Sequence, residues 1–440
     1  MARLKEYNGH YCESEYEYAF IGFLEAEGWK YSSGNNISRV TKRDVLIADD
    51  FKKFIADTNP DLTEDEVTKI YDNVRLVGAE SDFATLHKVY GWMVNGVQFT
   101  PQDELPRMIP LIDFDNWNKN IFRVVNQFTV EYTNNGQKEN RRPDVLLFVN
   151  GIPLCVIELK NPTDANATIY DAWEQINIRY WRDIPHLLHY CPLACISDGV
   201  KTRLGTVRTP YEHFYAWRRV NEGDAVSTLP FAETETMIKG VYSPERFLEI
   251  FRDYIYFQDS IYDSDEQEIV CRYPQFFATR LLKQSIIKSV VEKSGKGGTY
   301  FGATGCGKTY TMAFLARQLA LRCTDIPEIG SPTIILIVDR DELQKQGSKL
   351  FTKSKEFLNL GEVSVVKNRA QLRQELGARQ SGGFYICTIQ KFCDREDDKI
   401  GLINDRQNII CFSDEAHRTQ LEHSKKIQFS KDADENMKAM

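Results

Sequence analysis

The segment GTYFGATGCGKTYTMAFLARQLA, residues 298–320, decides the fold of the C-terminal part of the chain. It contains the pattern G-x-x-x-x-G-K-[ST] between a predicted short strand and a predicted helix. Glycines let backbone N–H groups approach phosphate oxygens closely, and the N-terminus of the helix adds a partial positive charge. The segment therefore predicts a phosphate-binding loop at the edge of a nucleotide-binding sheet.

Within this loop, Lys308 is expected to reach the β- and γ-phosphates of ATP, and Thr309 is expected to bind Mg²⁺. The other loop positions expected to contact the nucleotide are Gly302, Thr304, Gly305 and Gly307. The alternative is a glycine turn before an ordinary helix, which accounts for this segment alone. A second motif further along the chain favours the nucleotide site.

That second motif is IICFSDEAH, residues 409–417, in which Asp414 and Glu415 directly follow an apolar strand. Ligands of parallel sheets bind at this edge. Asp414 is expected to hold Mg²⁺ through water, and Glu415 to orient or deprotonate the attacking water. The alternative, a solvated acidic loop, explains neither the strand nor the separate phosphate loop. Strands and helices alternate through this region, which predicts a parallel α/β sheet.

Together the two motifs resemble superfamily 2 helicase-type motors, whose DEAH box matches residues 414–417. The resemblance implies that His417 couples the nucleotide state to the rest of the motor. It implies that Gln275 reads adenine, with an ordinary helix-start residue as the alternative. It also implies contacts to the DNA backbone from two segments, with the second favoured: VDRDELQKQ (Asp339, Arg340, Gln346) and TIQKF (Thr388, Gln390, Lys391).

Motors of this family have a second RecA-like lobe that closes the ATP site with an arginine. The sequence ends at Met440, soon after the DEAH box, so we expect a truncated chain with only the first RecA-like lobe. Such a chain would bind Mg·ATP without translocating. Its hydrolysis would be slow, because the charge on the γ-phosphate would lack that arginine.

A second candidate site lies in RRPDVLLFVNGIPLCVIELKNP, residues 141–162, which contains Asp144 and Glu158-x-Lys160. Carboxylates on neighbouring strands can share a divalent metal, and residues two apart on a strand face the same side. Asp144 and Glu158 are therefore predicted to bind Mg²⁺, and Lys160 to position or activate the attacking water. The alternative is a polar sheet edge with one Lys–Glu pair. Against it, both acids lie among apolar residues, where unpaired charge is costly.

The hairpin between these acids sets a geometric condition. A plain two-residue turn at Asn150-Gly151 would place Asp144 opposite Ile157, leaving Glu158 on the other face of the sheet. A three-residue loop, with Gly151 left-handed as a bulge, would pair Asp144 with Val156 and put both acids on one face. Shared metal binding therefore predicts a one-residue offset, supplied by Gly151.

The string from NQFTV through NP, residues 126–162, resembles the PD-(D/E)xK nuclease domain of type I restriction subunits, which is fused to this kind of motor. The resemblance covers the chain from about Glu13 to the DEAH box. It implies an acid on an N-terminal helix, for which Glu17 is preferred over Glu13. It also implies a Gln-x-x-x-Tyr pair. Gln175 fits, but Tyr180 lies one residue too far along, which on a straight helix rotates it away.

The implied activity is ATP-dependent translocation on double-stranded DNA with Mg²⁺-dependent cleavage. The implied partners are separate methyltransferase (modification) and specificity subunits of the same system. Two alternatives stay open: a superfamily 2 motor fused to a repair or defence nuclease outside type I systems, or an ATP-binding recruitment module with an inactive nuclease.

Composition is consistent with this picture. The chain has 440 residues, 42% hydrophobic and 27% charged, with a net charge of −8. The length predicts a nuclease domain of mixed sheet and flanking helices (1–220), a helical connector (221–260) and the first RecA-like lobe (261–440). The negative charge argues against a small DNA-binding module, so basic residues should gather locally along a DNA path. No membrane-length apolar run or signal peptide is found, which predicts a cytoplasmic protein.

The ten cysteines are typical of buried thiols in a reducing compartment. One cluster permits a zinc site as an alternative, although its spacing matches no common zinc pattern. The cluster consists of His186, His189, Cys191 and Cys195. These residues are expected at the end of a helix that leads into a buried strand.

Overall fold

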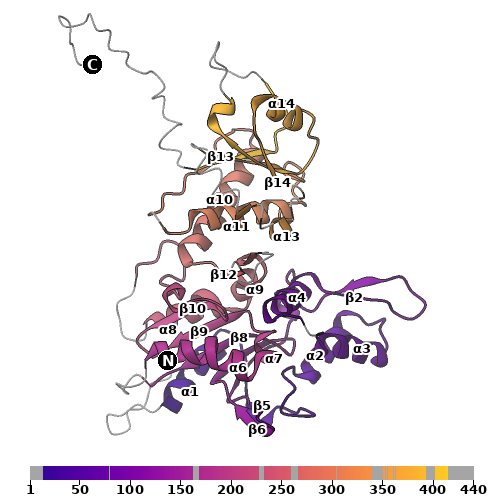
Figure 1. The fold of residues 1–440 in the computed structure, drawn as a ribbon, viewed down its shortest axis with the longest axis vertical. Coiled ribbons are helices and arrows are strands. Elements are labelled where there is room, and N and C mark those ends of the chain that lie inside the picture. Colours follow the sequence, from indigo (N-terminus) through magenta and orange to yellow (C-terminus); the bar gives the residue numbers. More distant parts are fainter. Residues whose placement is uncertain are drawn as a thin grey trace, which may run out of the picture. The chain divides into compact units, whose positions relative to one another are not determined.

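The computed structural model describes residues 13–78, 80–161, 168–226, 232–258, 266–303, 305–338, 350–351, 353, 355–359, 361, 363–392 and 402–414. The chain forms two compact units, Met1–Phe277 and Ala278–Met440 (Figure 1). Both contain helices and parallel strand pairs, as the predicted mixed α/β class requires. Segment 221–260, predicted as a connector, belongs to the first unit, and the functional boundaries at 220 and 260 stay predictions.

The first unit is built on a six-stranded mixed sheet. Its strands, in spatial order, are β1 (Lys30–Ser33), β4 (Phe122–Asn126), β7 (Val145–Val149), β8 (Ile152–Leu159), β9 (Leu193–Ser197) and β10 (Thr202–Thr206). Pairs β1–β4 and β8–β9 are parallel and the others antiparallel. Every residue of β7, β8 and β9 is buried, which explains why these strands have continuous apolar sequences rather than alternating ones.

Helices cover this sheet. Helix α1 (Glu13–Ala26) packs against β1, β4 and β8, and α5 (Ile169–Glu174) packs against β8 and β9. The hydroxyl of Tyr16 on α1 lies 2.7 Å from Ser197 Oγ at the end of β9. The helical segments that follow α5 and those that precede β11 are η3 (Gln175–Tyr180), α6 (Trp181–Asp183), α7 (Pro185–Leu188), α8 (Ala232–Met237), η5 (Ile238–Tyr242) and α9 (Pro244–Asp253).

The segment of sequence between β1 and β4 forms further helices. They are α2 (Ala48–Thr58), α3 (Glu64–Arg75) and α4 (Asp82–Asn95). Helix α3 begins with a capping box, in which Thr63 and Glu66 satisfy each other's backbone N–H groups. The short helical turns of the first unit are η1 (Gly34–Asn36), η2 (Trp117–Lys119) and η4 (Tyr211–His213). Its two-stranded sheets pair β2 (Val97–Phe99) with β3 (Arg107–Ile109), β5 (Val130–Asn134) with β6 (Gln137–Arg141), and β11 (Ile255–Gln258) with β12 (Gln267–Val270).

The β7–β8 hairpin differs from the predicted one. Val149 pairs with Ile152, so Asn150 and Gly151 form a plain two-residue turn, with φ values of 51° and 75°. The one-residue offset comes instead from a bulge at Leu154, because Leu147 pairs with Cys155 and Phe148 with Pro153. The predicted three-residue loop is therefore wrong. The bulge shifts the register in the other direction, and Val145 lies opposite Ile157.

The second unit contains a parallel four-stranded sheet. Its strands, in spatial order, are β14 (Val363–Val365), β15 (Phe384–Thr388), β13 (Thr333–Val338) and β16 (Ile409–Ser413). One of its core clusters consists of Ile335, Val366, Leu372, Leu376, Tyr385 and Cys387. The accompanying helices are α10 (Tyr273–Val291), which begins in the first unit, α11 (Lys308–Leu321), α13 (Lys355–Leu358), α14 (Arg369–Gly377) and η7 (Ile389–Phe392).

The strand predicted just before the phosphate loop is absent. Residues 297–303 have no regular secondary structure. Glycines at 295, 297 and 298 provide no side chains that could pack against a neighbouring strand, and they lose much conformational entropy when ordered. Phe301, expected in that strand, is 95% exposed. Separately, none of the described helices combines the length and apolar character needed to cross a membrane.

Candidate functional site

Two carboxylates, from Asp144 and Glu158, come together at one end of the first sheet. Asp144 directly precedes β7, and Glu158 is the next-to-last residue of β8. Continuing the observed register by one residue places Asp144 opposite Glu158, so both side chains project from the same face. Asp144 Oδ2 also accepts a hydrogen bond from the backbone N–H of Leu159, at 2.8 Å. The bulge at Leu154 thus produces the shared face that a common cation requires.

Glu158 is fully buried and only partly satisfied. Its Oε1 accepts a 2.6 Å hydrogen bond from the Tyr180 hydroxyl, whereas Oε2 has no hydrogen-bond donor among the residues that the structure describes. Burial, and then the neighbouring Asp144 carboxylate, raise the pKa of Glu158 well above its ordinary value, opposed by Lys160 and by the Tyr180 hydrogen bond. A buried carboxylate oxygen without a donor is costly, so Oε2 is suited to a positively charged ligand.

The ammonium of Lys160 lies beside this carboxylate. Lys160 Nζ is 4.0 Å from Glu158 Oε2 and donates a 3.0 Å hydrogen bond to Gln175 Oε1. Gln175 Nε2 donates in turn to the Tyr180 hydroxyl at 2.8 Å, and that hydroxyl donates to Glu158. The side chains therefore form a closed polar circuit in which each fixes the orientation of the next.

Tyr180 joins this circuit because the backbone from Gln175 to Tyr180 is π-helical. The expectation that Tyr180 lies away from Gln175 assumed a straight α-helix, and it is wrong. A π-helix is hydrogen-bonded from residue i to i+5, so its wider turn brings residues five apart to one side. The extra residue between Gln175 and Tyr180 is thus accommodated in the backbone, and the two side chains still meet.

Replacing Tyr180 with phenylalanine should reduce any DNA cleavage at this site by about 10- to 100-fold, the usual effect of losing a group that orients a metal ligand. The change removes the hydrogen bond that Tyr180 donates to Glu158 Oε1 and so loosens the orientation of the buried carboxylate. Nicking of supercoiled plasmid provides the measurement. Tyr170→Phe, on the adjoining helix and 47% exposed, is the matched control. Equal activity of the two variants would show that Tyr180 does not orient the site.

Glu17, the preferred acid of the N-terminal helix, is buried at the same end of the sheet. Its Oε1 accepts a 2.6 Å hydrogen bond from Asn126 Nδ2, and its Oε2 accepts one from Gln127 Nε2. Asn126 pairs with Val145, and the Gln127 N–H donates to the carbonyl of Asp144. Sequence reasoning missed Asn126 and Gln127, although two amides directly after an apolar strand could have indicated them. The side chain of Glu13, the other candidate, lies outside the described residues.

The residues at this end of the sheet fit a divalent cation. Magnesium in proteins is commonly bound through one or two carboxylates, with water or substrate oxygens completing the shell. Asp144 and Glu158 provide such a pair, and the donor-less Glu158 Oε2 is the atom a cation would satisfy. The three acids come from separate segments: Asp144 directly precedes β7, Glu158 lies in β8 and Glu17 in α1.

The loop predicted to bind phosphate leads directly into a helix, as expected, although the strand expected before it is absent. Gly305 and Gly307 adopt positive φ values of 79° and 82°, and Gly307 caps the N-terminus of α11. Lys308 and Thr309 are the first residues of that helix, and Lys308 Nζ donates to the Gly302 carbonyl at 3.2 Å. The ammonium therefore folds back over the loop, where it stays near the position that phosphate oxygens would occupy.

Asp414 lies directly after β16, and its N–H donates to the Ile337 carbonyl of β13 at 2.9 Å. This is the carboxyl edge of the parallel sheet, as expected. Its approach to Lys308 and Thr309 around one nucleotide stays a prediction. Several predicted residues lie outside the described ones: Thr304, Glu415 and His417, and the weaker DNA-contact candidates Asp339, Arg340 and Gln346.

Two of the other residues predicted for the motor, Gln275 and Lys391, make internal side-chain contacts. Gln275 is buried in the first turn of α10, and its Oε1 accepts a hydrogen bond from the N–H of Arg272 at 2.8 Å. This contact is typical of a residue at the start of a helix, which was the alternative to adenine binding. Thr388 is buried at the end of β15. Gln390 is exposed on η7, whereas Lys391 Nζ donates to the Val366 carbonyl at 2.6 Å. Adenine reading and DNA contact by these residues stay predictions.

The residues of the zinc alternative do not converge. They are His186, His189, Cys191 and Cys195. His189 Nε2 lies 2.8 Å from Asp82 Oδ1, and Cys191 Sγ donates to the Pro153 carbonyl at 3.5 Å. In the part of the chain that the structure describes, no three His, Cys, Asp or Glu side chains are grouped as metal ligands.

Two family models match the chain, one within the first unit and one that covers the second unit. The family model described as type I restriction enzyme R protein N terminus matches residues 11–213. The SWI2/SNF2 ATPase model matches residues 274–440. The first match contains both carboxylates and the π-helical segment, and the second contains the phosphate loop.

Among curated relatives, a putative type I restriction enzyme MjaIXP endonuclease subunit of Methanocaldococcus jannaschii is 31% identical over 433 residues, 92% of this chain and 39% of the relative. The type I restriction enzyme HindI endonuclease subunit of Haemophilus influenzae is 30% identical over 437 residues, 95% of this chain and 40% of the relative. The chain thus spans about two fifths of the length of these relatives. Over nearly its whole length the chain is therefore similar to type I restriction enzyme endonuclease subunits, with an R protein N-terminal match followed by a SWI2/SNF2 ATPase match.

Proposed function

We propose that this chain contains the nuclease and the first motor lobe of a type I restriction subunit. In this proposal the first unit is a PD-(D/E)xK nuclease that cleaves double-stranded DNA with Mg²⁺. The second is a RecA-like lobe that binds the ATP used for translocation by the whole subunit. The observation that carries the nuclease proposal is the buried Glu158, with a donor-less Oε2 beside Asp144 and Lys160.

Each residue has a distinct role in the proposed cleavage. Asp144 and Glu158 would hold the metal ion, which when bound lowers the pKa of a water molecule and polarises the scissile phosphate. Lys160, oriented by Gln175, would hold the attacking water and stabilise the negative charge that develops on the phosphate. Tyr180 keeps Glu158 turned toward Asp144, and Glu17 holds the neighbouring strand end through Asn126 and Gln127.

The partners belong to the proposal as well. The relatives are named as endonuclease subunits of type I restriction enzymes, which supports action together with other subunits. We propose that these are separate methyltransferase and specificity subunits. In such a system the specificity subunit would choose the site, so this chain would cleave without sequence preference. A cytoplasmic location would follow from the DNA substrate. Co-purification of the whole subunit with a methyltransferase would distinguish a type I enzyme from a motor–nuclease fusion of another system.

The nuclease proposal is tested with the 440-residue chain and supercoiled plasmid. We expect nicked circles in the presence of Mg²⁺ and none after addition of a chelator. The folded state is checked by tryptophan fluorescence. Nicking that persists in chelator would point to another mechanism or a contaminant. A folded chain that nicks no DNA at any Mg²⁺ concentration would favour the inactive recruitment module.

For the ATP site, Lys308→Ala should weaken ATP binding by at least about tenfold, because the ammonium neutralises the β- and γ-phosphates. Fluorescence titration with a labelled ATP analogue measures this. Lys283→Ala is the matched control, since Lys283 donates to Gln318 within the same unit and lies outside the loop. Equal affinities of the two variants would exclude a role of Lys308 in nucleotide binding.

A further inference from the structure

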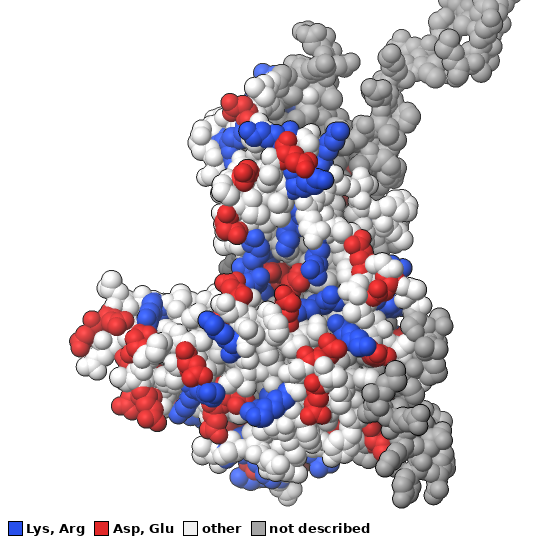
Figure 2. All heavy atoms as spheres, turned by 180° about the vertical axis from the view of Figure 1, so that it is seen from behind, with Lys and Arg blue, Asp and Glu red and all other residues white. Residues whose placement is uncertain are grey.

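Positive charge gathers in one cleft of the first unit although the chain is acidic overall. On the face of that unit seen in Figure 2, Lys and Arg side chains are interspersed with Asp and Glu. Three separate basic segments meet at a cleft of about 590 Å³, and each contributes an arginine to its lining. These segments are RVTKR (39–43), KENRR (138–142) and RYWR (179–182).

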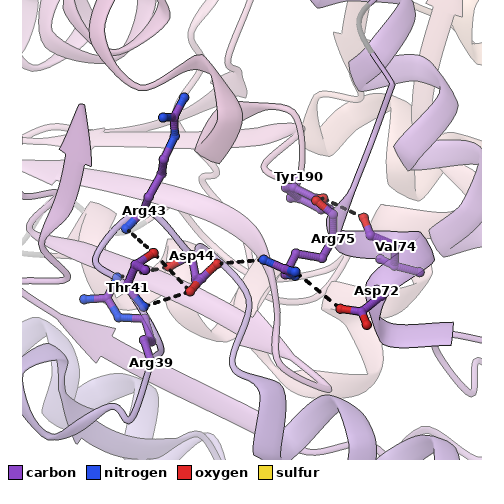
Figure 3. A network of polar contacts seen from close by, with 8 residues as sticks. All are labelled: Arg39, Thr41, Arg43, Asp44, Asp72, Val74, Arg75 and Tyr190. Atoms are coloured by element: carbon purple, nitrogen blue, oxygen red, sulfur yellow. Dashed lines mark hydrogen bonds and ion pairs between the residues drawn. The ribbon is translucent and has the colours of Figure 1, made fainter. Parts of the chain in front are cut away.

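The first wall of the cleft is a loop whose conformation is fixed by Asp44. The Asp44 carboxylate accepts from the Thr41 N–H at 2.9 Å and from Arg75 of α3 at 3.3 Å (Figure 3). The Lys42 carbonyl accepts the N–H of Glu131 in β5 at 3.0 Å, which fastens the loop to the hairpin. Arg43 points away from this network in Figure 3 and lines the cleft.

The opposite wall is ordered by Asp183. Its side chain is only 6% exposed and pairs with Arg141 of β6 at 2.6 Å and with Arg182 of α6 at 2.8 Å. Arg182 nevertheless remains 65% exposed. Arg43 is exposed too, and within the described residues its guanidinium has no hydrogen bond or ion pair. The buried carboxylate therefore positions arginines whose outer N–H groups face solvent.

The remaining charges leave the cleft positive. The Glu139 carboxylate accepts hydrogen bonds from Tyr132 Oη at 2.6 Å and from Asn134 Nδ2 at 2.8 Å. Burial lowers the pKa of His186 to about 4, so this imidazole is neutral near pH 7 and adds no charge. Three arginines against two carboxylates leave one net positive charge, and Arg43 and Arg182 are the arginines of the lining that solvent reaches most.

The cleft lies next to the paired carboxylates along the chain. Arg141 precedes Asp144 by three residues, a span of at most about 10 Å. Asp183 follows Tyr180 by three residues of helix, about 4.5 Å of axial rise. Since successive phosphates of one strand are about 3.4 Å apart along the duplex axis, the cleft is within reach of phosphates a few nucleotides from a bond held at Asp144 and Glu158.

From this arrangement we infer that the cleft binds the phosphodiester backbone of DNA beside the cleavage site, through Arg43 and Arg182. The inference rests on the proposed nuclease function and adds to it the surface that holds the flanking DNA. The contacts are made to phosphates only, so they give affinity without sequence preference. This agrees with a nuclease whose target would be chosen by another subunit.

Duplex binding by the 440-residue chain is measured in chelator at several salt concentrations. Arg43→Gln and Arg182→Gln should each weaken binding about threefold or more near physiological salt. Each should also lower the slope of log affinity against log salt by about 0.9, the value for one lost phosphate contact. The loss should be the same for duplexes of different sequence. Arg107→Gln, on β3 outside the cleft, is the matched control and should leave both quantities unchanged.

The possible outcomes separate this inference from the proposed function. If the wild type binds and nicks DNA while Arg43→Gln and Arg182→Gln keep its affinity and salt slope, the cleft is not the DNA surface, although the nuclease stands. If the wild type binds no duplex, both proposals fall. Calorimetric titration with inorganic phosphate distinguishes a free-anion site. Phosphate binding that is lost in the variants, with unchanged DNA affinity, would overturn the assignment to DNA.

Discussion

Glu158→Gln is expected to stabilise the metal-free chain and at the same time to abolish cleavage. The fully buried Glu158 has one oxygen without a donor, and Asp144 lies beside it. A neutral amide removes the repulsion, and its nitrogen can donate to Asp144. The free energy of unfolding of the first unit should rise by about 1–3 kcal/mol, the usual cost of a buried unsatisfied group. Nicking should fall more than about 100-fold, because a metal ligand is lost.

The pH dependence of stability gives the same substitution a second readout. The pKa of Glu158 is raised in the folded state, so between the unfolded and folded pKa values the folded chain binds more protons. Stability from this group is therefore greatest below the unfolded pKa and falls as the pH rises toward the folded one. Glu158→Gln should flatten this decline.

Tryptophan fluorescence during urea unfolding measures both effects, because every tryptophan of the chain lies in the first unit. Glu104→Gln, at an exposed site, is the matched control and should leave stability and nicking unchanged. A lower free energy of unfolding in Glu158→Gln than in wild type would mean that the fold already satisfies the Glu158 carboxylate. That result would contradict its proposed role as a ligand for a metal ion.

Gly151→Ala is expected to prevent stable folding of the first unit, at a cost above about 3 kcal/mol. Gly151 has a φ of 75°, and an added Cβ would lie 2.2 Å from the carbonyl oxygen of Ile47. That segment cannot retreat easily, because the Ile47 N–H donates to the Gly151 carbonyl at 2.8 Å. The hairpin and the start of α2 would therefore have to separate.

Gly136→Ala provides the matched control. Gly136 also turns a hairpin, with a φ of 81°, but an added Cβ would meet nothing within 4 Å. Only the conformational cost of about 1 kcal/mol should then appear. Soluble yield and urea unfolding followed by tryptophan fluorescence compare the two variants. Similar losses in both would show that the contact with Ile47 is unimportant.

The sequence predicted those features that depend on local pattern. The glycines of the phosphate loop, the apolar strand before Asp414 and the Asn150-Gly151 turn all appear where the residues indicate them. The bulge at Leu154 was missed, although Pro153 directly before it was a signal, because proline within a strand that is paired on both sides is usually found at a bulge. The one-residue offset in the β7–β8 hairpin was therefore expected, but at Gly151 instead of Leu154.

Side-chain partners were harder to predict than backbone elements. Tyr180 seemed displaced from Gln175 because a π-helical turn has no simple signature in sequence, and here it is stabilised by long-range contacts such as the bond to Glu158. Lys391 looked like a free cation on a loop, yet it donates to the Val366 carbonyl. Such partners come from distant segments, which periodicity and spacing cannot identify.

Binding of a divalent cation by the ATP-free chain tests the pairing of Asp144 with Glu158 most directly. Calorimetric titration with Mn²⁺, compared among wild type, Asp144→Asn and Glu158→Gln, measures it, and tryptophan fluorescence verifies that all three are folded. We expect one site in the wild type that is lost in both variants. Undiminished Mn²⁺ binding in both folded variants would contradict the assignment of these two carboxylates as the metal site.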